Sequence, residues 1–129
     1  MDEQAKKHGV FSWCELMTTN PNAAKEFYTK LFGWTTEDMN MVPEMTYTVV
    51  KAGGKEIGGI MPMPQQGQGM PPHWGNYVTV DDVDATARTA QQLGGKVLMG
   101  PQDIPNVGRF CWIQDPQGAM IGAITYKTA

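Results

Sequence analysis

Apolar residues follow two different spacings along this chain, and each change of spacing marks a predicted element. Residues 10–17, VFSWCELM, form a short apolar run between polar segments and predict a strand. The next segment, residues 21–32, has apolar side chains three and four positions apart, which predicts a helix with one apolar face. Asn20 and Pro21 are typical of a helix start and Gly33 of a helix end. Strands are predicted to follow at 34–37, 47–50 and 56–61.

The same order of elements returns in the second half. A strand is predicted at 74–80, and Asp81-Asp82 precedes a helix at 83–93 that ends at Gly94-Gly95. Three further strands are predicted, the last two forming a hairpin across Asp115-Pro116-Gln117-Gly118; they span residues 97–99, 109–114 and 119–126.

Fixed offsets between matching positions indicate that the two halves are a duplication. Trp13 and Gly75 are 62 positions apart, and so are the helix-ending glycines Gly33 and Gly95. Gly58 and Gly122, in the last strand of each half, are offset by 64. A ferredoxin-like fold also has a helix after each first strand, but only one hairpin between its helices. Three strands, a linker and a further strand fit between these two, so we predict an α+β fold of two βαβββ modules with the helices outside.

The domain organisation follows from this repeat. We expect residues 1–9 to be a flexible tail and residues 10–126 to form a single domain. Within it, module one covers 10–61 and module two 73–126. Residues 62–72, rich in Pro, Gly and Gln, form the linker between them.

Composition excludes several classes of function. The 129 residues carry a formal net charge of -3 and show no basic stripe, which disfavours nucleic acid as a partner. Apolar runs of four or five residues fall far short of the roughly 20 that a membrane helix needs. The first residues, MDEQAKKHG, lack the apolar stretch of a signal peptide, so we expect a cytoplasmic protein with two free cysteines.

Two segments carry a resemblance to a known family. WCELMTTNPNAAKEFYTKLFGW and IQDPQGAMIGAITY resemble the opening and closing segments of modules in the vicinal oxygen chelate superfamily. That superfamily includes glyoxalase I, extradiol dioxygenases and bleomycin-resistance proteins. The resemblance covers residues 10–126, and GGIMPMP and PPHW resemble the linker of metal-poor glyoxalase-like members. It implies a cup-shaped, mostly antiparallel sheet.

The resemblance also assigns four metal-ligand positions, and their residues do not suit a metal. Matching the first strands and the final strands of the modules places these positions at Trp13, Gly58, Gly75 and Gly122. Divalent ions need His, Asp, Glu or Cys side chains, so we expect neither a metal nor another cofactor. His73 shares the strand parity of Gly75, and we expect it at the mouth of the cup.

Strand alternation assigns side chains to the cup. Trp13 places Glu15 on the same face, whereas Ser12, Cys14 and Leu16 face the helix. Pairing Gln114 with Ala119 across the turn sends Phe110 and Trp112 outward to the second helix. The residues then expected at a ligand site are Trp13, Glu15, Tyr47, Gly58, Gly75, Tyr77, Arg109, Cys111, Gly122 and Tyr126.

Three features of this predicted cup allow two interpretations each. Trp13 either lines an open aromatic slot or fills the space that a metal would leave. Glu15 and Arg109 act as a proton-transfer group and an anion anchor, or they pair with each other. Cys111 is a reactive thiol activated by Arg109, or an inert core residue, which is the commoner case for a strand cysteine.

Two classes of function remain. We favour a binding protein that holds a small aromatic or semi-apolar molecule in a metal-free cup, as bleomycin-resistance proteins do. The alternative is a metal-independent glyoxalase-like or hydroxylase-like enzyme (a lyase, isomerase or oxygenase) that uses Glu15 or His73 for proton transfer. We also expect a homodimer, because the edges of a curled sheet expose unpaired backbone groups.

Overall fold

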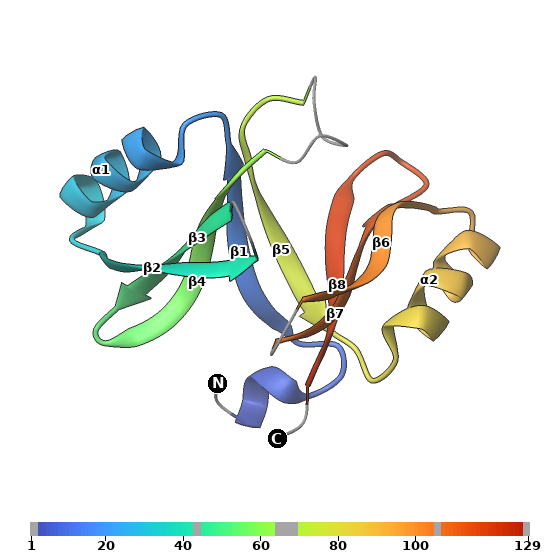
Figure 1. Ribbon diagram of the computed structural model, residues 1–129. Helices are drawn as coiled ribbons and strands as arrows, with labels where there is room; N and C mark the ends of the chain where they lie inside the picture. The colour runs from blue at the N-terminus through green and yellow to red at the C-terminus, as the bar shows by residue number, and fades with distance from the viewer. Residues whose placement is uncertain (1–2, 43–44, 64–69, 105–106, 128–129) are drawn as a thin grey trace. The chain divides into compact units, whose positions relative to one another are not determined.

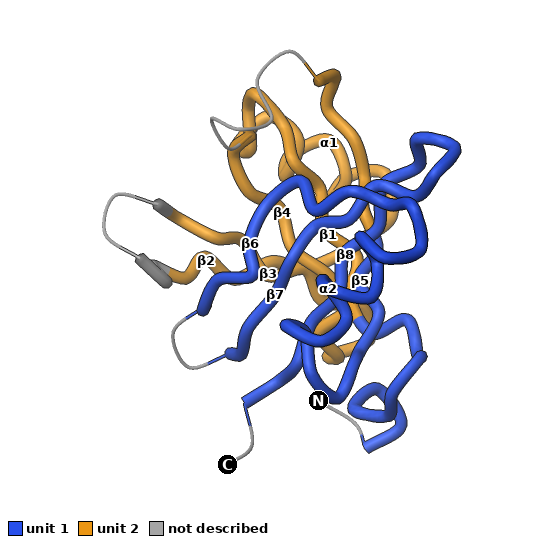
Figure 2. The backbone as a smooth tube through the Cα atoms, turned by 90° about the vertical axis from the view of Figure 1, so that its right-hand side faces the viewer, with its two compact units in different colours: residues 1–12, 76–129 blue, residues 13–75 orange. Residues whose placement is uncertain are grey.

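The computed structural model describes residues 3–42, 45–63, 70–104 and 107–127. The chain divides into two compact units (Figure 2). Unit 1 comprises Met1–Ser12 and Asn76–Ala129, and unit 2 comprises Trp13–Gly75. Residues 64–69 of the expected linker lie outside the described residues.

Unit 2 contains one helix and a four-stranded sheet (Figure 1). The strands lie in the order β2-β3-β4-β1, and β1 runs parallel to β4 while the other neighbours are antiparallel. Leu16, Val50 and Ile60 form a core on the sheet face that α1 covers. The elements are β1 (Phe11–Thr18), α1 (Pro21–Phe32), β2 (Thr35–Val42), β3 (Met45–Ala52) and β4 (Lys55–Pro62).

Unit 1 repeats this architecture with strands in the order β5-β8-β7-β6. Here β5 and β8 are parallel, and the other neighbours are antiparallel. Its core lies between the sheet and α2 and contains Val83, Ala87, Cys111, Ile113 and Ala123. The elements are η1 (Glu3–Lys6), β5 (His73–Thr79), α2 (Val83–Gln92), β6 (Lys96–Ile104), β7 (Gly108–Gln114) and β8 (Met120–Tyr126). The boundary between the units falls inside two strands, so residues 73–75 of β5 belong to unit 2 and residues 11–12 of β1 to unit 1.

Both helices begin where the sequence predicts, because each has a polar cap. The Asn20 side chain accepts a hydrogen bond from the Ala23 amide at 3.0 Å. Asp82 Oδ1 accepts from the amides of Asp84 and Ala85 at 3.0 and 3.1 Å. These bonds satisfy N–H groups that have no partner within the helix, which fixes where helix formation starts.

The predicted order of elements, βαβββ twice, is confirmed, and β2, β3, β4 and β5 lie between the helices as the two-module fold requires. Strands β2 and β6 are longer than the predicted 34–37 and 97–99. Both are edge strands. The sequence of β2 is mostly polar, and β6 contains Gly100 and Pro101, two residues that usually interrupt a strand. The first nine residues, expected to be a flexible tail, include η1 and bond to β5 through the Gly9 amide and the Thr79 carbonyl.

Candidate functional site

Three of the predicted site residues form a hydrogen-bonded chain in unit 2. The Trp13 indole N–H donates to the Tyr47 hydroxyl at 2.8 Å, and that hydroxyl donates to Glu15 Oε2, also at 2.8 Å. Glu15 is 6% exposed and Tyr47 8% exposed, whereas Trp13 is only partly buried. The Glu15 carboxylate is therefore shielded from water. Hydrogen bonds connect it through the Tyr47 phenol to the partly exposed Trp13 indole.

Strand pairing explains why these residues meet. Glu15 lies level with Gly59 on β4, and Gly59 lies level with Val49 on β3, so Tyr47 shares their face two residues along. A Cβ atom at Gly59 would collide with the ring and hydroxyl of Tyr47. The missing side chain therefore allows the Tyr47 ring to lie flat against the strand and reach Glu15.

The prediction that Gly58 shares this face is wrong. Gly58 lies level with Cys14 on β1 and with Val50 on β3, on the face that α1 covers. The prediction equated Gly58 with Gly122 by counting positions, and the strand pairing puts Gly59 in that place instead. The sequence did contain a signal for the correct residue, because Gly59, directly after Gly58, is a second glycine that could take this position.

Unit 1 has its own aromatic group on the sheet face away from α2. Tyr77 lies level with Gly122, where a Cβ atom would come within 2.7 Å of the Tyr77 ring carbon Cε1. The Tyr77 ring centroid is 4.7 Å from that of Trp112 and 6.2 Å from that of Phe110. Trp112 is 2% exposed, and among the described residues its indole N–H has no hydrogen-bond partner.

The structure reverses the predicted faces of strand β7. Arg109 and Cys111 were expected beside Gly122, with Phe110 and Trp112 outward; instead Phe110 and Trp112 share the Gly122 face. Gln114 pairs with Met120, not with Ala119, because the turn is closed by the bond from the Asp115 amide to the Ala119 carbonyl. A slip of one residue moves every side chain of a strand to the other face.

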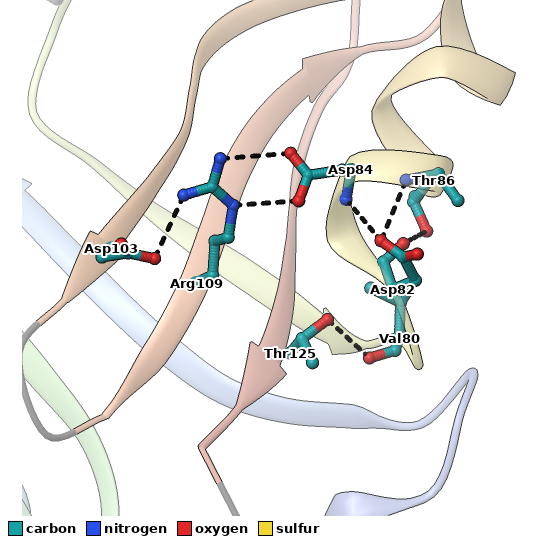
Figure 3. A network of polar contacts seen from close by, with 8 residues as sticks. Val80, Asp82, Asp84, Thr86, Asp103, Arg109 and Thr125 are labelled. Atoms are coloured by element: carbon teal, nitrogen blue, oxygen red, sulfur yellow. Dashed lines mark hydrogen bonds and ion pairs between the residues drawn. The ribbon is translucent and has the colours of Figure 1, made fainter.

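Arg109 is held by two carboxylates on the α2 side (Figure 3). Its Nε and Nη2 donate to Asp84 at 3.0 and 3.2 Å, and its Nη1 donates to Asp103 at 3.1 Å. These hydrogen bonds raise the pKa of Arg109 and lower that of Asp84. Arg109 therefore links α2 to β6 on the face of the sheet that α2 covers, not on the face of Gly122 where the sequence placed it.

Cys111 lies fully buried in the core beneath α2. Burial raises the pKa of its thiol to about 11, with a smaller contribution from the charge of Asp84. The thiol therefore stays protonated at neutral pH and lacks the reactivity of a thiolate. Its burial in the core favours the interpretation of Cys111 as an inert core residue.

The remaining predicted site residues lie on β5 and β8. Tyr126 shares the parity of Gly122, and its hydroxyl is 2.8 Å from Ser12 Oγ; burial raises the Tyr126 pKa. His73 shares the parity of Gly75. The His73 Nδ1 lies 2.9 Å from the Pro71 carbonyl, which can only accept, so Nδ1 carries the proton. The buried His73 Nε2 has no hydrogen-bond partner among the described residues.

The described residues do not fit a divalent metal. Trp13, Gly58, Gly75 and Gly122, at the positions assigned to ligands, have no side-chain donor atom for one. Nowhere in the described part of the chain do three His, Cys, Asp or Glu side chains gather closely enough to hold an ion.

Of the helices that the structure describes, none is long and apolar enough to cross a membrane.

The fold class of this chain is the two-unit βαβββ architecture. Solved structures share this fold at low sequence identity. A methylmalonyl-CoA epimerase from Mycobacterium tuberculosis superposes with a TM-score of 0.64 at 13% identity, covering 95% of this chain and 93% of the other. A Streptomyces coelicolor methylmalonyl-CoA epimerase gives 0.66 at 16% identity, covering 95% and 100%.

The family itself is established by sequence. Residues 10–122 match the model of the Glyoxalase/Bleomycin resistance protein/Dioxygenase superfamily, and the chain belongs to that superfamily. The resemblance that the sequence motifs suggested is therefore confirmed.

Similar proteins are about twice as long as this chain. The protein named "Putative glyoxylase CFP32" of Mycobacterium tuberculosis is 45% identical over 118 residues, covering 90% of this chain and 44% of its own length. "Anthracycline biosynthesis protein DnrV" of Streptomyces peucetius is 32% identical over 124 residues, covering 86% and 45%. The chain thus spans less than half the length of these relatives.

Proposed function

We propose that this protein binds a small, planar aromatic or semi-apolar molecule, without a metal, on the sheet face that carries Trp13. The observation that carries the proposal is the chain from Trp13 through Tyr47 to the buried Glu15 carboxylate. The Trp13 indole is partly exposed, and its hydrogen bond to the Tyr47 hydroxyl fixes the orientation of the ring. Aromatic surfaces of this kind stack on flat ligands, and their rigidity limits the entropy lost on binding.

Two further observations support this proposal. Gly59 allows Tyr47 to lie close to the strand and to accept the Trp13 hydrogen bond, so two aromatic rings share this face. One relative is named for anthracycline biosynthesis. Anthracyclines carry a planar fused-ring system, which is the shape of ligand that an aromatic surface suits.

Titration with an anthracycline, followed by calorimetry, tests the binding. We expect Trp13→Ala to weaken it by roughly 1–3 kcal/mol, a typical contribution of one stacked ring. Trp34→Ala is the matched control, because Trp34 packs beside α1 on the other face of the same unit. If Trp13→Ala instead lowers the unfolding free energy by about 3–5 kcal/mol and leaves the titration unchanged, Trp13 is a filler of the core and the proposal fails.

Glu15 supports a second candidate, a metal-independent enzyme. A buried carboxylate that is hydrogen-bonded to a phenol can accept a proton relayed by that phenol. The hemithioacetal of methylglyoxal and glutathione, a glyoxalase substrate, is a suitable first probe. Glu15→Gln keeps an acceptor for Tyr47 but removes the base. If the wild type turns the probe over and Glu15→Gln binds it without turnover, the protein is an enzyme that uses Glu15. If neither protein turns the probe over, the result supports the binding function.

A further inference from the structure

His73 carries a buried nitrogen atom whose hydrogen-bonding capacity is unused. The His73 side chain is partly exposed, but its Nε2 atom is buried and has no hydrogen-bond partner among the described residues. Buried polar atoms are usually paired, because an unpaired one has lost its bonds to water without gaining a bond in the protein. The unpaired Nε2 therefore points to a group that the described part of the chain does not supply.

The other nitrogen of the ring determines what this group has to be. Nδ1 lies 2.9 Å from the Pro71 carbonyl oxygen, which can only accept, so Nδ1 donates and carries the ring proton. In the neutral ring Nε2 then holds a lone pair and is only an acceptor. A hydrogen-bond donor or a metal ion fits a lone pair. The donor is the better fit, because no three metal-binding side chains gather anywhere in the described residues.

His73 lies on the same sheet face as Trp13. The first residues of β5 belong to unit 2, and β5 stands next to β1 in the order of the strands. The Trp74 ring packs on Tyr28 of α1 with centroids 5.3 Å apart, so Trp74 is on the α1 side of the sheet. Side chains alternate along a strand, and His73 therefore points to the opposite face. Trp13 shares that face, because alternation along β1 separates it from Leu16, which packs toward α1.

The unpaired state of Nε2 makes it a favourable anchor for a ligand. An acceptor that is open to water gives up a hydrogen bond to water before it binds a ligand, which reduces the gain. Nε2 is already out of contact with water, so a donor that reaches it forms a bond without this loss on the protein side. The ring is also held in place beforehand by Pro71, which lowers the entropic cost of binding.

We propose that the ligand of the Trp13 face is a hydroxylated aromatic molecule whose phenolic hydroxyl donates a hydrogen bond to His73 Nε2. The inference rests on the proposed function and narrows its ligand from any planar molecule to one with a donor on its rim. A phenolic hydroxyl lies in the plane of its ring, so the face of the ring stays free to stack on Trp13. His73 is here a specificity-determining residue, a role that needs no proton transfer.

Two probes of the same shape test this hydrogen bond. The hydroxyl of 2-naphthol donates, whereas the oxygen of 2-methoxynaphthalene only accepts. Calorimetric titration of the full chain should give an affinity about five- to tenfold higher for 2-naphthol, the gain expected from one hydrogen bond. Trp13→Ala should weaken the binding of both probes by a similar factor and leave their ratio unchanged.

Two substitutions at His73 separate the roles of its two nitrogen atoms. The amide of Asn can donate to Pro71 as Nδ1 does, but it places no acceptor at the position of Nε2, so His73→Asn should bind both probes equally. The longer side chain of Gln brings an oxygen near that position, and His73→Gln should keep part of the preference for 2-naphthol. His8→Asn is the matched control at the only other histidine of the chain and should keep the full preference.

Nuclear magnetic resonance of the imidazole nitrogens keeps the test decisive if a His73 variant fails to fold. In the wild type labelled with nitrogen-15 histidine, His73 should show a protonated Nδ1 and an unprotonated Nε2. Adding 2-naphthol should shift the Nε2 resonance much more than adding 2-methoxynaphthalene does. A structural role of His73 alone would give no such difference between the probes.

Four outcomes would overturn the proposal. The first two are a wild type that binds the two probes equally and one that binds neither. The others are a preference for 2-naphthol that His73→Asn retains, and a proton on Nε2 of His73 in the free protein. In each case the titration with an anthracycline decides separately whether the proposed function stands.

Discussion

The helices α1 and α2 occupy equivalent places in the two units but relate differently to their sheets. Helix α2 buries Val83 and Ala87, which are 2% and 6% exposed, whereas α1 has no buried residue although it carries more large apolar side chains. Both helices start at a polar cap after a strand. Small residues let α2 pack closely on its sheet. The bulky residues of α1 leave much of its apolar face uncovered, so apolar content alone does not decide what a helix buries.

The largest contrast is expected between two tryptophans. Trp112→Ala should lower the free energy of unfolding by about 3–5 kcal/mol, because Trp112 is 2% exposed and its removal leaves a cavity. Trp74→Ala removes the same side chain where it is 40% exposed and contacts the Tyr28 and Trp34 rings, so it should cost only about 1–2 kcal/mol. Urea denaturation at a concentration where the chain is monomeric measures both. Equal losses would show that unit 2 is packed as tightly as unit 1.

A matched change on each helix sharpens the comparison. Ala87→Leu adds bulk where α2 contacts its core and should cost about 1–3 kcal/mol. Ala24→Leu is the same change on α1, at a partly buried position, and we expect a cost below about 1 kcal/mol because the added atoms can turn toward solvent. Thermal unfolding of both variants gives the difference. A larger loss for Ala24→Leu would mean that α1 packs more tightly on its sheet than α2 does.

The helix caps should show no contrast. Asn20→Ala and Asp82→Ala each remove an acceptor for the first helical amides, and each should cost about 1 kcal/mol. Serine at either position restores an acceptor and serves as the control. Urea midpoints measure the loss of stability for each variant. Similar losses in the two units would show that the helices differ in their packing and not in how they start. A cost at one cap twice that at the other would mean that helix formation also differs.

The smallest effect concerns pH and is confined to unit 1. Because Arg109 holds the Asp84 pKa below its ordinary value of 3.8, this pair contributes stability above that pH and loses it as the pH falls through the lower folded pKa. Arg109→Gln should therefore be less stable than the wild type at pH 6, and the gap should narrow as the pH falls below 3.8. Lys30→Gln, at an exposed pair in unit 2, is the control. Urea midpoints measured from pH 6 downward provide the comparison, and a gap that does not narrow in acid would exclude this mechanism.

Local signals in the sequence were sufficient for the elements. Asn20-Pro21 and Gly33 bounded α1 at the predicted residues, because capping and left-handed turns depend on neighbouring positions only. The duplicated order followed from spacing. The full lengths of β2 and β6 were missed, because β2 has a mostly polar sequence and β6 contains Gly100 and Pro101.

Faces of the later strands could not be predicted as securely. Alternation from Trp13 gave the correct partner, Glu15, because one unbroken strand connects them. Across the turn at 115–119 the assignment failed, because one extra residue in the loop exchanges the two faces of a strand. Arg109 and Cys111 were thereby placed at the site, and Phe110 and Trp112 were missed. The faces of the β7 side chains were assigned wrongly because the sequence pattern does not determine the geometry of this turn.

The two glycine–tyrosine pairs, Gly59 with Tyr47 and Gly122 with Tyr77, restrict the order in which these positions can change during evolution. In each pair the ring occupies the space that a side chain on the glycine would need. Replacing the glycine first forces a collision, whereas replacing the tyrosine first leaves only a cavity, which proteins tolerate better at moderate stability. A lineage that gains a metal-binding side chain at Gly122 therefore has to lose the Tyr77 ring beforehand, and the same order applies to Gly59 and Tyr47.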